Sequence, residues 1–328
     1  MVLRYRRRSE RGVKAALGRF FHEIRYPTTG RGKFIAGTLA ALVFSFLSLA
    51  VIGGFLLARA LTAPHAGEAL DPTQLIGTTQ SLTFETPDGI SHNGWFFPGL
   101  RRRPVIVVLH GYRSSRSEVL TLASFLQENR YNVFAFNLAG HGESPHNRTT
   151  LGFQETGELL AALDMLSRRS DIDGERIGLW GHSLGAYAAL NAAARFPGVK
   201  AVVLDSVYSR PEEMLRLELR RAGAHWLPLL STITRFEFWL YTYLYRRGNS
   251  ETPVEQLADI PKLFISGEDR PGLVELTRAL FEQAPNPKEY VPLRRTLLAT
   301  LGGEERKDYE NRVVSFFLTH LSLVRGAR

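Results

Sequence analysis

A serine between two glycines is the residue of this sequence best suited to chemistry. Ser183 stands in Gly181-His182-Ser183-Leu184-Gly185, which follows an apolar run and precedes an alanine-rich segment with helical spacing. This order predicts a strand, a sharp turn and a helix, and Gly181 and Gly185 permit the strained backbone that such a turn imposes on the serine. The Ser183 hydroxyl then projects from the carboxyl edge of a sheet as a nucleophile, and the Leu184 amide points at the atom that it attacks. The alternative is a buried turn with an inert serine.

A serine hydroxyl needs partners before it can act. A histidine must accept its proton, and a carboxylate must fix the tautomer of that histidine. The chain has nine histidines and no cysteine, and it contains neither a His-Glu-x-x-His motif nor a glycine-rich phosphate loop. We therefore expect no metal and no cofactor, and the chemistry falls to side chains and backbone amides.

Strands alternating with helices would position this turn. The pattern predicts strands at 81–86, 94–97, 104–109, 131–136, 200–205, 262–267 and 288–291, besides the one before Ser183. It predicts helices at 117–129, at 152–169, directly after Ser183, and at 305–321. Such alternation is typical of a mostly parallel sheet with right-handed crossovers. About 250 residues, 79–328, suffice for one large domain of this α/β class.

An aromatic insert interrupts the alternation. No strand is predicted between residues 209 and 258, and we expect a helical cap at about 210–258 over the carboxyl edge of the sheet. Its aromatic residues are Trp226, Phe236, Phe238, Trp239, Tyr241, Tyr243 and Tyr245. They are expected to line an apolar substrate pocket. Two alternatives stay open: the aromatics only pack the cap, or they dip into a membrane surface.

The formal net charge of +9 is concentrated at the N-terminus. Residues 1–33 hold ten basic and two acidic side chains, a balance of +8 that leaves +1 for the rest of the chain. No nucleic-acid-binding signature accompanies this tail, so we expect no nucleic-acid partner. Residues 34–58 contain no charged residue, and a helix of this length spans the roughly 30 Å apolar core of a bilayer.

The basic excess sets the expected topology. By the positive-inside rule, residues 1–33 form a cytoplasmic tail and 34–58 a transmembrane helix. Residues 59–78 then form a linker, and the globular domain lies outside the cytoplasm of a single-pass protein of the cell (inner) membrane. A cleaved signal peptide is the alternative, because Ala58-Arg59-Ala60 resembles a cleavage site. The apolar stretch, however, exceeds the roughly 7–15 residues of a signal peptide, which favours an uncleaved anchor.

With these motifs in order, the sequence resembles the α/β-hydrolase superfamily over roughly residues 80–320. It is most similar to membrane-anchored bacterial members such as serine aminopeptidases, monoglyceride lipases and esterases. Three motifs carry the resemblance: His110-Gly111-Tyr112, Gly140-His141-Gly142-Glu143-Ser144 and Gly181-His182-Ser183-Leu184-Gly185. The resemblance implies the α/β-hydrolase fold, a mostly parallel sheet flanked by helices with a helical cap, preceded by one N-terminal transmembrane helix. Asn137 departs from the aspartate usual in the family, at a position that shapes a loop.

The resemblance also assigns roles to residues. It implies that the amides of Tyr112 and Leu184 form an oxyanion hole, that His110 and His141 are structural, and that His182 points away. The catalytic acid follows the strand that ends at Gly267, and there the resemblance favours Asp269. Glu268 and Asp205 are the weaker candidates for the acid.

The expected catalytic histidine is missing. The family places it in the loop before the last helix, here about 299–304, where it would fall at Thr300 or Leu301. His146 and His320 are the remaining candidates for the general base. His320 sits deep in the last predicted helix, on the order of 20 Å from that loop.

Two functions therefore stay open. The first is a membrane-anchored serine hydrolase that acts on carboxylic esters or amides through a Ser183 acyl-enzyme, with a small-molecule ester or lipid-like substrate. The second is a catalytically impaired pseudo-hydrolase that serves as a binding or scaffolding module for a protein partner of unknown identity. The intact serine motif favours the first function, and the missing histidine favours the second.

Overall fold

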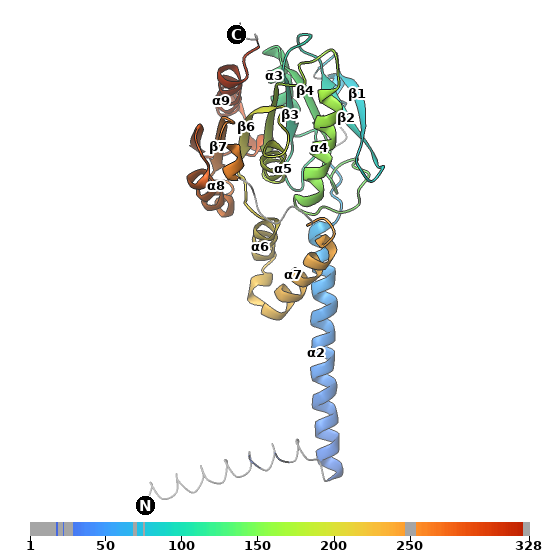
Figure 1. Cartoon of the computed structure of the whole chain (residues 1–328). Helices are drawn as coiled ribbons and strands as arrows, with labels where there is room; N and C mark the ends of the chain where they lie inside the picture. The colour runs from blue at the N-terminus through green and yellow to red at the C-terminus, as the bar shows by residue number, and fades with distance from the viewer. Residues whose placement is uncertain are drawn as a thin grey trace, which may run out of the picture.

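The computed structural model describes residues 29–67, 71–74, 76–246 and 254–323, together with Gly18 and His22. Most of the predicted basic tail, a few residues of the predicted linker, and residues 247–253 of the insert lie outside the described residues. Element labels follow Figure 1.

Short apolar and β-branched runs form one eight-stranded sheet in the order β1-β2-β4-β3-β5-β6-β7-β8. The strands are β1 (Gln80–Glu85), β2 (Ser91–Phe97), β3 (Val105–Leu109), β4 (Asn132–Phe136), β5 (Ile177–His182), β6 (Val199–Asp205), β7 (Lys262–Gly267) and β8 (Lys288–Leu293). β2 pairs antiparallel with β1 and β4, and every other neighbouring pair is parallel. β3, β4 and β5 are buried at every position, which explains their continuous apolar runs.

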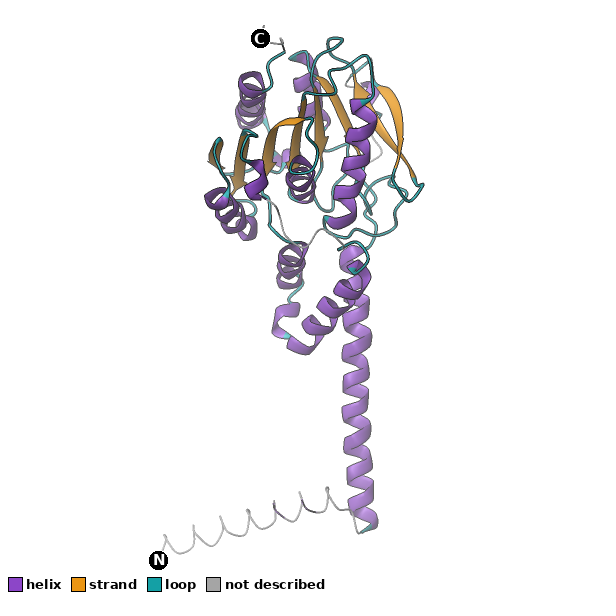
Figure 2. Ribbon diagram, viewed as in Figure 1, coloured by secondary structure: helices purple, strands orange, loops and turns teal. Residues whose placement is uncertain are grey.

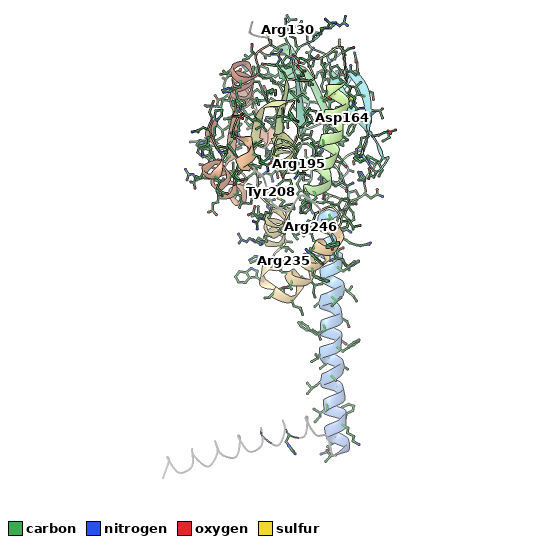
Figure 3. All side chains as sticks on the ribbon, in the orientation of Figure 1. Arg130, Asp164, Arg195, Tyr208, Arg235 and Arg246 are labelled. Atoms are coloured by element: carbon green, nitrogen blue, oxygen red, sulfur yellow. The ribbon has the colours of Figure 1, made fainter. Side chains whose placement is uncertain are left out.

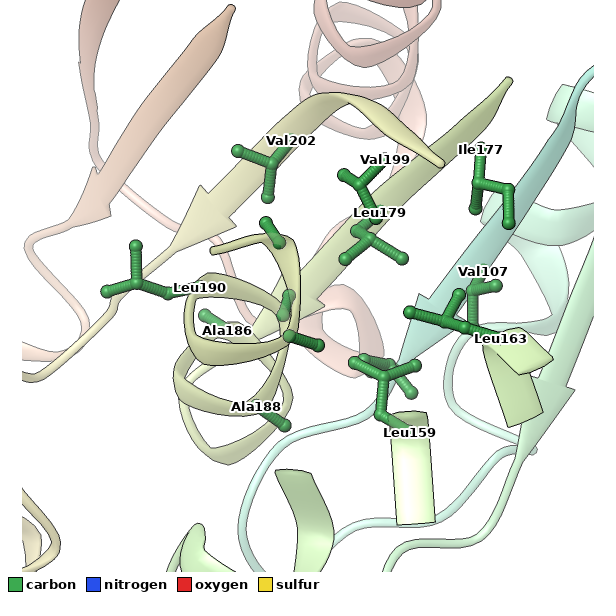
Figure 4. Packing of buried hydrophobic residues seen from close by; sticks show 14 of the residues in the cluster. Val107, Leu159, Leu163, Ile177, Leu179, Ala186, Ala188, Leu190, Val199 and Val202 are labelled. Atoms are coloured by element: carbon green, nitrogen blue, oxygen red, sulfur yellow. The ribbon is translucent and has the colours of Figure 1, made fainter. Parts of the chain in front are cut away.

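Helices cover both faces of the sheet (Figures 1 and 2). The sheet is flanked by α3 (Leu120–Glu128), α4 (Phe153–Ser167), α5 (Leu184–Ala193), α8 (Pro271–Gln283) and α9 (Gly303–His320). Alternate side chains of β3 enter two apolar clusters, Val107 with α4 and α5, and Val108 with α3 and α9. Figure 4 shows the first cluster, where Leu159 and Leu163 of α4 lie against Val107 and Leu179.

The structure confirms the α/β-hydrolase fold expected from the sequence, and the differences are local. Helix α8 begins at Pro271, directly after the loop that holds Asp269. The last helix begins at Gly303, so the loop between β8 and α9 runs over residues 294–302. This loop is shorter at both ends than the stretch 292–304 that the predicted strand and helix leave between them.

The N-terminal helix α2 (Gly30–Thr62) extends from the sheet domain (Figure 1). Among the described residues it is the one helix long and apolar enough to cross a membrane by length and composition. Its C-terminal part packs against helix α7 (Pro228–Thr242) of the insert. A Cβ added at Gly54 would lie 2.6 Å from the Ile233 side chain, and Thr234 Oγ1 donates a hydrogen bond to the Gly54 carbonyl at 3.2 Å. Gly54 thus lets the two helices approach closely.

The insert forms a cap of α6 (Pro211–Arg221), the 3-10 helix Ala224–Trp226, and α7. An apolar cluster fills the space between this cap and the sheet. Its members come from α2, the cap, helices α5 and α8, and two loops: Leu61, Leu151, Tyr187, Tyr208, Met214, Leu215, Leu219, Ala224, Phe238 and Leu273. Figure 3 labels Tyr208 at this junction.

The expectation that the cap aromatics line a pocket does not match the structure. Trp226 is 79% exposed and Trp239 43% exposed, and Phe236, Tyr243 and Tyr245 are also on the surface. The helical period explains the difference, because it turns Phe238 of α7 inward and leaves the neighbouring aromatics outward. An exposed apolar face beside α2 is the arrangement expected of the membrane-surface alternative.

Candidate active site

Ser183 occupies a sharp turn between β5 and α5. Its backbone dihedrals are φ 50° and ψ −106°, a region in which non-glycine residues are strained by about 1–3 kcal/mol. The Ser183 amide donates to the Asp205 carbonyl at 2.8 Å, and the Tyr187 amide donates to the Ser183 carbonyl at 3.0 Å. These bonds fix the turn from both sides, so the strain is held by the neighbouring strand and helix.

The two glycines of the motif are required by close backbone approach. A Cβ at Gly181 would lie 2.3 Å from the Gly185 carbonyl carbon, and a Cβ at Gly185 would lie 2.5 Å from the Leu109 carbonyl oxygen. Both distances are well below van der Waals contact. A larger residue at Gly181 would push β5 away from the start of α5, and one at Gly185 would push α5 away from β3.

The loop after β3 lies directly against this turn. Gly185 packs on Leu109 and His110, and a Cβ at Gly111 would lie 2.7 Å from the His182 ring. These contacts bring the backbone of Tyr112 beside the first turn of α5. The Leu184 amide begins that helix, where N–H groups have no intrahelical acceptor and the helix dipole is positive. The assignment of the Tyr112 and Leu184 amides to an oxyanion hole stays a prediction.

His110 and His141 shape the loops around the serine. His110 Nε2 accepts from the Leu138 amide at 3.0 Å, and His141 Nε2 accepts from the Arg113 amide at 3.0 Å. Their Nδ1 atoms contact carbonyl oxygens at 2.8 Å, which implies that Nδ1 carries the proton. Burial lowers the pKa of His110 to about 3 and that of His141 to about 4. Both rings are therefore neutral, and both of their nitrogens already have partners.

Asp269 lies in the loop after β7 and holds the loop before α9. Each of its carboxylate oxygens accepts from the Thr296 amide at 3.2 Å, and one also accepts from the Leu297 amide at 3.2 Å. The residues that face Asp269 are therefore Thr296 and Leu297. Thr300 and Leu301, the positions expected for a family histidine, have no hydrogen bond to Asp269 in the described part of the chain.

The difference follows from the loop itself. Thr300 is exposed, and Leu301 is buried in the apolar cluster on the α9 side of the sheet. Thr296 is fully buried, and its Oγ1 lies 3.3 Å from Ser206 Oγ. Among the described residues, no histidine side chain contacts Asp269.

Asp205, the weaker candidate for the acid, belongs to a buried polar network at the end of β6. Its Oδ1 accepts from Ser206 Oγ at 2.8 Å, and its Oδ2 accepts from the Tyr309 hydroxyl at 2.7 Å. Trp180 Nε1 donates in turn to the Tyr309 oxygen at 3.1 Å. Burial next to Asp205 raises the pKa of Tyr309 well above its usual value, so the phenol remains a donor.

His182 lies beside this network without a hydrogen bond to it. Its Nδ1 lies 3.4 Å from Asp205 Oδ2, and neither ring nitrogen has a hydrogen-bond partner within the described part of the chain. His182 and Asp205 are the histidine and carboxylate pair nearest in sequence to the turn. Sequence reasoning missed this pair, because the pairing of β5 with β6 that joins them is not a local motif.

The two candidate bases lie away from the turn. His320 Nε2 is 3.4 Å from Glu289 near the amino end of β8, whereas Ser183 follows the carboxyl end of β5. The His146 ring lies 5.2 Å from that of His92 on β2, and β2 is three strands from β5 in the sheet. That separation is about 14 Å. The structure therefore brings neither histidine to Ser183.

A surface pocket opens beside the turn. It has a cavity volume of about 360 Å³ and is lined by Leu61, Tyr112, Arg113, Glu218, Arg221, Ala222 and Arg270. Tyr112 connects this pocket to the loop beside Ser183, and Arg270 follows Asp269 in the chain. Ser183 itself is 4% exposed and is not among the residues that line this pocket.

Comparisons with known proteins agree with this fold. A family profile described as alpha/beta hydrolase fold matches residues 104–237. The chain is 28% identical over 237 residues to an uncharacterized protein of Mycobacterium tuberculosis, covering 71% of this chain and 77% of the relative. It is 32% identical over 146 residues to the uncharacterized protein YfhR of Salmonella typhi, covering 40% of this chain and 49% of that protein. A solved esterase of Pyrococcus furiosus superposes with a TM-score of 0.63 at 22% identity, covering 80% of this chain and 98% of the esterase.

Proposed function

Because the chain belongs to the α/β-hydrolase superfamily, we propose that it is a serine hydrolase that cleaves carboxylic esters or amides through Ser183. The strained backbone of Ser183, with φ 50° and ψ −106°, is the observation that carries this proposal. Strain at a residue with a nucleophilic side chain is typical of a functional site.

The proposed reaction proceeds through an acyl-enzyme. Ser183 Oγ attacks the carbonyl carbon and loses its proton to water, the carbonyl oxygen becomes negative, and the amides of Tyr112 and Leu184 stabilise it. The tetrahedral intermediate then collapses, and the alcohol or amine leaves with a proton taken from water. A second water molecule attacks the acyl-enzyme, which releases the carboxylic acid and returns a proton to Ser183. Removing one oxyanion donor in such enzymes lowers kcat by roughly 10²–10³.

The general base limits the expected rate. Asp269 is held by two backbone amides rather than by a histidine, and the histidine beside the serine, His182, lies 3.4 Å from Asp205 instead. We therefore expect slow turnover of activated esters such as p-nitrophenyl acetate. In serine proteases without a complete triad, the oxyanion hole and binding still give roughly 10³–10⁴-fold catalysis over water.

The missing histidine at Asp269 favours a second function. In this alternative the fold serves as a binding or scaffolding module, and the cap presents its surface to a protein partner. Labelling with a fluorophosphonate probe distinguishes the two functions. If the protein is a hydrolase, the probe should label it, and Ser183→Ala should abolish the labelling. Ser124→Ala, which changes a serine on α3, should leave the labelling intact. Absence of labelling in the folded native protein supports the binding module.

We also propose that α2 anchors the protein in the cell membrane, with the basic tail in the cytoplasm and the hydrolase domain outside it. The charge-free length of residues 34–58 and the basic tail before it support this topology. The aromatic residues exposed on α7 support a position of the cap at the outer surface of the cell membrane. Since α7 packs at Gly54, five residues before Arg59, the cap would reach about 7 Å below the end of the charge-free segment.

A further inference from the structure

A cluster of titratable side chains lies outside the candidate active site. It consists of His92 on β2, His146 in the loop after β4, and Glu158 on α4. Glu158 Oε1 lies 3.4 Å from His146 Nε2 and 4.0 Å from His92 Nε2. One ligand atom of each residue lies within 4.8 Å of the other two. Three separate parts of the fold thus direct metal-binding atoms at one point.

These three atoms have no hydrogen-bond partner in the described part of the chain. His92 is 2% exposed and Glu158 1% exposed, and the facing atoms of all three residues are buried. Buried polar atoms in folded proteins nearly always have a partner, because an unpaired polar atom loses its hydration without compensation. Three such atoms converging on one point indicate that a further group completes the cluster.

We infer that His92, His146 and Glu158 bind a divalent transition-metal ion, for which Zn²⁺ is the best fit. Two imidazoles and one carboxylate form a ligand set that zinc accepts, with bonds of about 2.0–2.2 Å. Tetrahedral ligands at that distance lie roughly 3.3 Å apart, close to the spacing of His146 and Glu158. The two wider spacings close by small side-chain rotations, and a water molecule supplies the fourth ligand.

The surroundings of the ligands fit this role. The second oxygen of Glu158 accepts from the Ala139 amide at 2.9 Å, which fixes the carboxylate. The His92 ring stacks on the Phe84 ring with their centroids 5.1 Å apart, and this contact fixes the orientation of the imidazole. Partners of this kind orient ligands and tune metal affinity. Burial lowers the pKa of His92 to about 4 and also lowers that of His146, so both rings are neutral, as metal binding requires.

The ion would have a structural role. Its ligands connect the antiparallel edge of the sheet, the loop after β4 and helix α4, and they lie three strands from β5. The ion would therefore stabilise the domain without taking part in acyl transfer. Metal content and thermal stability are the appropriate measurements, because activity at Ser183 is a separate property.

The test uses full-length protein in detergent, purified without a histidine tag. We expect about one zinc ion per chain by elemental analysis, a lower Tm after chelation, and recovery of the Tm when Zn²⁺ is added back. His146→Ala and Glu158→Gln should lose the ion, whereas His225→Ala, an exposed histidine in the cap, should retain it. Cobalt-loaded native protein should show the visible absorption of tetrahedral Co²⁺, a readout that does not depend on the variants folding.

The opposite result is equally clear. Metal-free native protein whose Tm responds neither to chelator nor to added Zn²⁺ or Co²⁺ would overturn the inference. Glu158 would then be protonated and share its proton with the neighbouring histidines. Burial does raise the pKa of Glu158 well above its usual value, which makes that state the natural alternative.

Discussion

Leu297→His is expected to raise the esterase rate of this protein, because it places an imidazole beside Asp269. The Leu297 amide already lies 3.2 Å from an Asp269 carboxylate oxygen, so the new ring starts within reach of its acid. Leu297 is half-buried. Replacing it should therefore lower the free energy of unfolding by less than the roughly 2–5 kcal/mol lost when a fully buried leucine is truncated. Thr296→His is the less favourable choice, because Thr296 is fully buried and overpacking there costs about 1–3 kcal/mol.

The size of the gain follows from what a triad contributes. Loss of the serine or histidine in a serine protease costs about 2 × 10⁶ in kcat, and this sets the upper limit for restoring the base. A ring introduced on an unadapted loop will recover part of that effect. We expect at least a tenfold increase in kcat/KM, equivalent to about 1.4 kcal/mol of transition-state stabilisation.

The assay is hydrolysis of p-nitrophenyl acetate by native and variant protein in the same detergent. Thr300→His is the matched control, because Thr300 is exposed on the same loop and does not face Asp269; it should leave the rate unchanged. Adding Ser183→Ala to Leu297→His should abolish the gain. If Leu297→His and Thr296→His both fold, both label with fluorophosphonate and neither exceeds the native rate, Asp269 is not positioned as the acid.

Three further predictions test other parts of the structure. Tyr309→Phe leaves Asp205 Oδ2 and Trp180 Nε1 without a partner and should lower the free energy of unfolding by about 1–3 kcal/mol in urea; a change below about 0.5 kcal/mol would contradict the network. In vesicles of brominated lipid, tryptophan fluorescence should be quenched, and the double change Trp226→Phe, Trp239→Phe should remove most of that quenching; unquenched native emission would reject a cap at the membrane. In cells, the chain should remain in the membrane fraction with its domain open to external protease, and a soluble protein beginning near Leu61 would instead indicate a cleaved signal peptide.

The strands and the serine turn were predictable because their signals are local. An apolar run, two glycines and an alanine-rich segment suffice to predict β5, the turn at Ser183 and α5. The absence of a family histidine could also be seen in the sequence. The position of such a histidine could not be predicted from the sequence. It depends on where α9 starts, at Gly303, and on the contacts of Asp269, and both are set by tertiary packing.

The remaining features depend on residues far apart in the chain. His92, His146 and Glu158 have no motif spacing and meet only because β2, the loop after β4 and α4 pack at one edge of the sheet. The outward direction of the cap aromatics depends on which face of α7 meets α2 and the sheet. The aromatic composition alone indicates an apolar surface. It does not indicate whether that surface faces a substrate pocket, the aqueous solvent or a lipid membrane.

The Tyr112 hydroxyl donates a hydrogen bond of 2.6 Å to the carbonyl of Leu61, the penultimate residue of α2. The same residue that would lend its amide to the oxyanion hole is therefore fastened to the end of the anchor. Just beyond it, the His65 amide and carbonyl bond to Gly140 and Gly142, so the chain leaving α2 is also built into the loop after β4. The end of α2 is consequently a structural part of the loops around the proposed site. A shortened protein that begins after residue 65 would lose these hydrogen bonds, so any activity measured on it should be compared with that of the full chain.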